Sequence, residues 1–241
     1  QSWETMLKKM GLGLFQFDIM RNRGLEMVGW MDIALNHFQA PRNEAERRHY
    51  AIFASLKLYI EESAGVSDNL PEQQLETLWH FVAEHDLAQE MGFWFVPLAT
   101  MYRQRHPTED ATNQLEAAFD LVRRQNDPWL LAMSFLIGAG SMYNDPTQAN
   151  EEHLQEAWTI FEALDDPFGK GAILNMFAHA AYTQERPLQE VIDVFLLAQT
   201  YHLQSGDYYS AAYVFGQLGG FFIQNRDCLL YTSDAADELL G

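Results

Sequence analysis

The stretch LQEAWTIFEALDDPFGKGAIL, residues 154–174, holds one complete copy of a phrase that recurs along the chain. A bulky apolar residue is followed by Ala three positions later, by Asp nine positions after that, and by an aromatic residue two further on. The three copies are Leu115, Ala118, Asp127 and Trp129; Leu154, Ala157, Asp166 and Phe168; and Phe195, Ala198, Asp207 and Tyr209. Self-similarity at a period near forty residues is typical of stacked helix pairs.

The agreement continues past each Asp, at what we call the packing positions. A small residue stands at plus five, a bulky apolar one at plus eight and a small one at plus twelve. They are Ala132, Phe135 and Ala139; Gly171, Leu174 and Ala178; and Ala212, Phe215 and Gly219. The two small residues are seven apart, so they share one face of a helix and let a neighbouring helix approach closely. We expect each Asp to cap the N-terminus of a helix and each aromatic to anchor that helix on its predecessor.

Apolar periodicity and turn signals predict an all-α chain. No stretch alternates apolar and polar residues in the manner of a strand. We expect helices over 3–20, 25–38, 44–62, 71–85 and 87–104, the last with a kink at Pro97, and then three pairs: 109–125 with 129–143, 149–164 with 168–184, and 187–204 with 208–224.

Composition excludes several classes of function. The formal charge is −19, with 34 acidic and 15 basic residues, and this argues against a nucleic-acid surface, which needs clustered Lys and Arg. The single Cys228 excludes a disulfide framework and fits a cytoplasmic location. No run approaches about 18 consecutive apolar residues, so the sequence predicts no membrane span.

Residues 228–241 depart from the phrase. CLLYTSDAADE resembles the translated read-through of a sequencing adapter. We therefore divide the chain into a helical-repeat domain over 1–227, clearest over 109–224, and a non-native tail over 228–241. The second helix of the last pair then lacks a following unit, and we expect its apolar face, with Tyr213, Phe215, Leu218 and Phe222, to be left uncovered.

The segments NDPWLLA (126–132), DDPFGKG (165–171) and GDYY (206–209) resemble the tetratricopeptide-like repeats of large bacterial signal-transducing ATPases, such as MalT-like activators with a LuxR-type DNA-binding domain and cyclase-linked regulators. Over 3–104 the likeness is degenerate, with Met91-Gly92-Phe93 in place of the Asp-containing turn. The resemblance implies a right-handed α-solenoid of about five and a half helix pairs. It also implies a role in binding a protein partner or another domain of the parent chain. ATPase activity is not implied, because the chain has no phosphate loop.

We do not expect an enzyme, a cofactor or a metal site. His80 and His85 lie five apart and lack the HExxH pattern of a zinc helix, and there is no nucleophile elbow. Taking the small residue at plus twelve as a landmark, we expect a concave groove that contains Tyr143, Asn175, His179, Tyr182 and Tyr213. Rings, an amide and an imidazole suit a peptide or a small polar ligand, although the tyrosines could equally fill space between helices. A small-molecule inducer sensor, and less readily an enzyme with an unrecognised groove site, remain as alternatives to a protein-binding scaffold.

Overall fold

The computed structural model describes residues 24–63, 72–139 and 148–224, and every regular element in these ranges is a helix. The all-α prediction is therefore confirmed for this part of the chain. The elements are α2 (Gly24–His37), α3 (Glu44–Ser63), α4 (Glu72–Glu84), α5 (Ala88–Met91), the 3-10 turn η1 (Gly92–Trp94), α6 (Phe95–Arg105), α7 (Glu109–Arg123), α8 (Pro128–Ala139), α9 (Gln148–Ala163), α10 (Pro167–Thr183), α11 (Leu188–Ser205) and α12 (Tyr208–Gln224). The helix expected over 3–20 and the tail over 228–241 lie outside the described residues.

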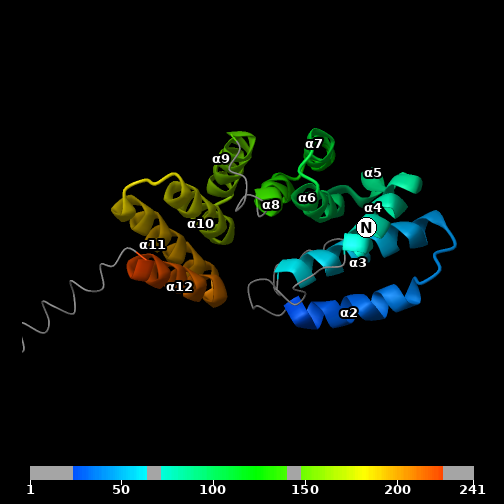
Figure 1. Ribbon diagram of the computed structural model, residues 1–241, viewed down its shortest axis with the longest axis horizontal. Coiled ribbons are helices and arrows are strands. Elements are labelled where there is room, and N and C mark those ends of the chain that lie inside the picture. Colours follow the sequence, from blue (N-terminus) through cyan, green and yellow to red (C-terminus); the bar gives the residue numbers. More distant parts are fainter. Residues whose placement is uncertain (1–23, 64–71, 140–147, 225–241) are drawn as a thin grey trace, which may run out of the picture.

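The helices form a row in which neighbours in sequence are also neighbours in space (Figure 1). The row runs from α2 and α3 to α11 and α12 and curves, so that α2 and α12 lie on the same side of the picture. Antiparallel partners are α7 with α8, α9 with α10, and α11 with α12; we call each such pair a unit. Contacts also link each unit to the next, most extensively where α10 packs against α11.

Most helix ends lie within two residues of those predicted, but the helix expected over 87–104 is broken. The break falls at Gly92, whose φ of 56° is a left-handed conformation that favours glycine. The kink predicted at Pro97 is wrong. Pro97 lies in the first turn of α6, where its missing N–H costs no helical hydrogen bond.

The three recurrent aspartates cap helices, as predicted. Asp127 Oδ1 accepts a hydrogen bond from the Leu130 N–H at 3.1 Å, and Asp166 Oδ1 accepts from the Phe168 N–H at 3.0 Å. Asp207 Oδ1 accepts from the Ser210 N–H at 3.0 Å. The residue before each cap has a positive φ: 53° at Asn126, 50° at Asp165 and 77° at Gly206. This combination reverses the chain at the end of one helix and begins the next in a single step.

An earlier unit, formed by α4 with α5, η1 and α6, has the same turn without the capping aspartate. Asp86 has a φ of 50°, and Leu87, forty positions before Asp127, follows it without a side-chain cap. Its packing positions are Gly92, Phe95 and Ala99, which again read small, bulky and small. The prediction that Met91-Gly92-Phe93 replaces the turn is therefore wrong, because the turn lies at Asp86-Leu87 and Gly92 is the small residue at plus five.

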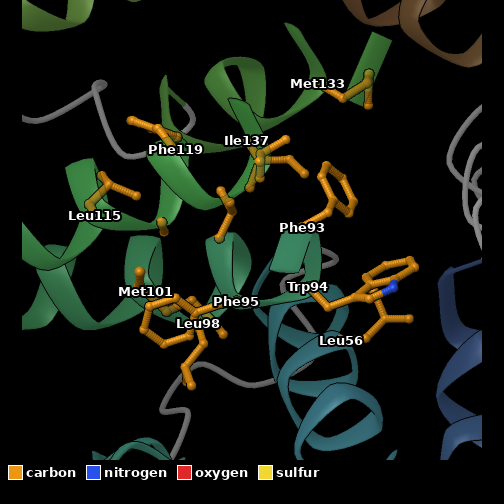
Figure 2. Packing of buried hydrophobic residues seen from close by; sticks show 14 of the residues in the cluster. Leu56, Phe93, Trp94, Phe95, Leu98, Met101, Leu115, Phe119, Met133 and Ile137 are labelled. Atoms are coloured by element: carbon orange, nitrogen blue, oxygen red, sulfur yellow. The ribbon is translucent and has the colours of Figure 1, made fainter. Parts of the chain in front are cut away.

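The buried apolar side chains follow the row of helices. One cluster extends from α2 to α10, and a smaller one, built around Phe195, Val214 and Phe221, holds the last unit together. Figure 2 shows side chains of α3, α6, α7 and α8 meeting in the larger cluster, among them Leu56, Leu98, Leu115 and Ile137. Each unit thus buries its apolar face against its neighbours.

Candidate binding surfaces

The structure brings three of the five predicted groove residues together. Asn175, His179 and Tyr182 lie on α10 at spacings of four and three residues, which places them along one stripe of the helix. Tyr213 lies on α12 with an exposed side chain, and Tyr143 falls outside the described residues. Both α10 and α12 are the second helices of their units. The four described groove candidates therefore all lie on second helices of their units.

The stripe on α10 packs partly into the last unit. The His179 ring meets Phe195 edge-on, with centroids 5.1 Å apart, and the Tyr182 ring lies 4.2 Å from that of Phe221. Burial disfavours the charged imidazolium and lowers the pKa of His179. His179 and Tyr182 therefore help to join α10 to α11 and α12. Their role in binding a partner stays a prediction.

A second polar group lies between α10 and α11, and two of its members, Gln199 and His202, were not singled out from the sequence. His202 on α11 is buried, and its ring lies against Gly171, where an added Cβ would stand 3.0 Å from ring atoms. Helix α10 runs antiparallel to α11, and Gly171 lies opposite His202 while His179 lies opposite Phe195. In this register Asn175 lies level with Gln199. We call Asn175, Gln199, His202 and Asp207 the polar seam.

The polar seam is incompletely hydrogen-bonded. Asn175 Oδ1, Gln199 Nε2 and His202 Nε2 are buried and accept or donate no hydrogen bond in the described part of the chain. His202 Nδ1 lies 3.3 Å from Asp207 Oδ2. This distance allows an ion pair, but the two atoms do not have the geometry of a hydrogen bond. Burial of Asp207 opposes its ionisation, but contacts with His202 and Ser210 outweigh burial and lower its pKa. Buried polar atoms of this kind are uncommon in native proteins.

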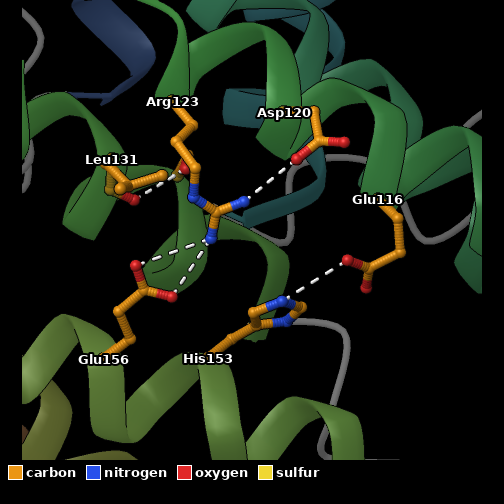
Figure 3. A network of polar contacts seen from close by, with 7 residues as sticks. Glu116, Asp120, Arg123, Leu131, His153 and Glu156 are labelled. Carbon is orange, nitrogen blue, oxygen red and sulfur yellow. Dashed lines mark hydrogen bonds and ion pairs between the residues drawn. The ribbon is translucent and has the colours of Figure 1, made fainter. Parts of the chain in front are cut away.

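The first helices of two neighbouring units are joined by charged side chains (Figure 3). Arg123 on α7 lies 3.1 Å from Glu156 on α9 and 3.0 Å from Asp120 on its own helix. His153 on α9 lies 3.4 Å from Glu116 on α7. Such exposed pairs contribute about 0–1 kcal/mol each to the stability of the fold. Their main effect is to fix how α7 lies against α9. The surface they form is predominantly acidic.

A pocket of about 220 Å³ lies among α4, α5, α6 and α7. Its walls are partly apolar, through Trp79 and Phe95, and it carries two carboxylates, Asp86 and Asp110. The remaining lining residues are Val82, Ala83, Ala88 and Gln114, so no basic side chain lines it. Two carboxylates beside aromatic walls, with no basic side chain among the lining residues, favour a small cationic ligand.

Within 24–63, 72–139 and 148–224, no group of three or more His, Cys, Asp or Glu side chains could hold a metal ion. None of the described helices combines the length and apolar character needed to cross a bilayer.

A scan against protein-family models found no match, and searches of curated proteins and of solved structures found no significant similarity.

Proposed function

We propose that this chain is a protein-interaction scaffold: a right-handed, tetratricopeptide-like solenoid within a larger cytoplasmic bacterial regulator. Binding a partner, or another domain of the parent chain, would set the activity of an attached effector. Support comes from the row of helix units with recurrent caps and packing positions, and from the resemblance of segments 126–132, 165–171 and 206–209 to such repeats. Arrays of this kind offer extended surfaces to other proteins.

The observation that carries the proposal is the exposed apolar surface of the last unit. Most of the large apolar side chains that are exposed in the described chain lie on α11 and α12, namely Leu196, Leu197, Leu203, Tyr208, Tyr209, Tyr213 and Phe215. Concentrations of exposed apolar side chains mark sites of protein association more often than chance. Tyrosines are also enriched in such interfaces, because each adds a large contact area and a hydrogen-bonding tip.

The test begins with the genomic reading frame that encodes 1–227. A phosphate loop upstream, with a DNA-binding or cyclase domain downstream, supports the regulator, and each encoded domain can then be titrated against this chain by calorimetry. We expect at least one to bind, and the Asn175→Ala, His179→Ala double variant to weaken that binding while helicity is retained. An unchanged affinity would remove the α10 stripe from the interface. A frame with no further domain would contradict the regulator.

A small-molecule sensor is the second candidate, and the pocket between Asp86 and Asp110 favours it. A sensor that binds a small organic cation there should melt at a higher temperature when amines are added, because a ligand that binds only the folded state stabilises it. The Asp110→Asn variant should lose most of that shift. A panel of amines that leaves the melting temperature unchanged would eliminate this candidate.

A further inference from the structure

The pocket among α4, α5, α6 and α7 has a counterpart in the next unit along the chain. Two rings in contact mark each place, and a shift of forty positions relates them: Trp79 and Phe95 in the pocket, Phe119 and Phe135 in the next unit. The ring centroids lie 5.8 Å apart in the pocket and 5.0 Å apart in the next unit. The same shift relates the left-handed turn residues, Asp86 with a φ of 50° and Asn126 with a φ of 53°. The two places can therefore be compared residue by residue.

In the next unit, side chains of the protein itself occupy this place. The Arg123 guanidinium lies over the Phe135 ring, 5.7 Å from its centroid. His153 of α9 stacks on the same ring, with centroids 4.6 Å apart and an interplanar angle of 12°. Arg123 also donates hydrogen bonds to Asp120 at 3.0 Å and to Glu156 at 3.1 Å (Figure 3). A planar cation over an aromatic ring, held by carboxylates, is thus the arrangement found here.

In the pocket, smaller or more flexible residues replace both occupants. Ala83 stands forty positions before Arg123. Helices α7 and α9 are related by thirty-nine positions, so Gln114 corresponds to His153. Ala83 and Gln114 line the pocket, and neither supplies a charge or a ring. The space of about 220 Å³ equals the volume of roughly seven water molecules, which is enough for a guanidinium group on a short alkyl chain.

The carboxylates also differ between the two places. The acids that hold Arg123 are not repeated, since their positions carry His80 and Ala117. The pocket instead has carboxylates where the next unit has neutral residues: Asp86 for Asn126, and Asp110 for Ala149. Both of these aspartates are exposed and lie at the mouth of the pocket, whereas the buried Phe95 forms its floor. The pocket therefore lacks a cation of its own and carries negative charge that attracts one.

We propose that this pocket binds a guanidinium group, which lies along the aromatic walls as Arg123 lies over Phe135 and donates hydrogen bonds to Asp86 and Asp110. A guanidinium fits better than an ammonium group because it is planar, stacks on aromatic rings and directs its N–H groups in one plane. Ammonium compounds bind the same carboxylates more weakly. The proposal rests on the small-molecule candidate above, whose ligand class it names, and it does not depend on the scaffold role.

The probe is butylguanidinium, titrated into the full chain and followed by the indole N–H resonance of Trp79 in two-dimensional NMR spectra. Trp79→Phe assigns that resonance. Butylammonium, with the same chain and charge, is the matched control ligand. We expect a saturable shift and a dissociation constant at least fivefold lower for butylguanidinium. Asp110→Asn should weaken binding about fivefold, as for the loss of one exposed ion pair. Glu109→Gln should leave binding unchanged, because Glu109 shares the first turn of α7 but does not line the pocket.

A third variant tests the correspondence with the next unit. Ala83→Arg places a guanidinium on α4 at the position that matches Arg123, and it should abolish binding of the probe. The source of the guanidinium is tested with N-acetylarginine methylamide, which resembles an arginine within a protein chain. Binding as tight as that of butylguanidinium indicates an arginine of a partner protein. Binding at least tenfold weaker indicates a free small molecule.

Three results would overturn the proposal. Equal affinity for butylguanidinium and butylammonium would show that the pocket does not select a planar cation, and would leave the small-molecule candidate standing. No saturable shift with either cation would remove both. Shifts of similar size at the other indole groups, or equal weakening by Asp110→Asn and Glu109→Gln, would show that the cation binds non-specifically to the acidic surface. None of these results bears on the scaffold role, which is tested with the encoded domains.

Discussion

Replacing each capping aspartate by alanine should destabilise the protein to a different extent, although the three residues occupy equivalent positions in the phrase. Asp127 makes its capping hydrogen bond at an exposed site. Asp127→Ala should therefore cost about 1 kcal/mol, the usual loss for a removed N-cap. This variant is the reference for the other two.

Asp166 has a second role, because its Oδ2 accepts a hydrogen bond from Trp129 Nε1 of the preceding unit at 2.8 Å. A hydrogen bond to a charged group adds about 1.5–3 kcal/mol, and the site is half-buried, so we take the lower end. Asp166→Ala should thus cost about 2–3 kcal/mol. Asp207 is fully buried beside His202, so Asp207→Ala removes the cap and also leaves a buried imidazole without its partner. The expected cost is about 2–4 kcal/mol.

Urea unfolding followed by circular dichroism measures the three losses. A double-mutant cycle with Trp129→Phe isolates the bond between units and should give a coupling of about 1.5 kcal/mol with Asp166 and none with Asp127. Equal losses at all three aspartates, or no coupling between Trp129 and Asp166, would refute the reasoning. The protein would then use these residues as caps alone.

Further predictions concern packing and pH. Gly169→Ala should destabilise the fold by about 1–3 kcal/mol, because a Cβ there would lie 2.2 Å from the buried Phe161 ring; Gly216→Ala, with no atom within 4 Å, should stabilise it by up to about 1 kcal/mol. Urea midpoints that move in the same direction for both variants would contradict this pair. Because the pKa of His179 is lowered in the folded protein, the neutral ring contributes fully to the stability of the fold above the unfolded-state pKa of about 6.5. That contribution is lost as the pH falls below this value. His179→Asn should therefore flatten the loss of stability between about pH 7.5 and 5, and an unaltered slope in thermal melts at both ends of that range would exclude this role. Ionised Asp207 stabilises the fold above its unfolded pKa and loses that effect only as the pH falls through its lowered folded value. Asp207→Asn should accordingly weaken stability most at neutral pH, and a variant equally weakened in strong acid would show that charge is not the cause.

The sequence predicted the helices and caps because both depend on local chemistry. Asp127, Asp166 and Asp207 are each followed by a helix with free N–H groups in its first turn, and the spacing alone identifies them. The turn of the degenerate unit was misplaced at Met91-Gly92-Phe93 because Leu87 replaces the aspartate and Gln89 the aromatic residue. Its turn depends instead on the left-handed conformation of Asp86, for which the residue type is only a weak signal.

The environment of side chains between helices was harder to predict. His179 and Tyr182 are predicted in an open groove, but the structure packs them against Phe195 and Phe221 of the last unit. Of the polar seam, the sequence singled out Asn175 and Asp207 but not Gln199 and His202, which stand on a helix whose period was read from its apolar residues alone. Such contacts depend on crossing angles between helices, which a repeat phrase does not specify.

Amide hydrogen exchange of the Asp207→Ala variant tests most directly whether the chain is a row of units that depend on their neighbours. In such a row, the energetic cost of damage to the last unit stays local. Exchange should accelerate across α11 and α12, partly in α10, and remain at the parent rate from α3 to α8. A uniform acceleration over all described helices would show a single cooperative core and would contradict the stacked-unit architecture on which the proposed binding surfaces rest.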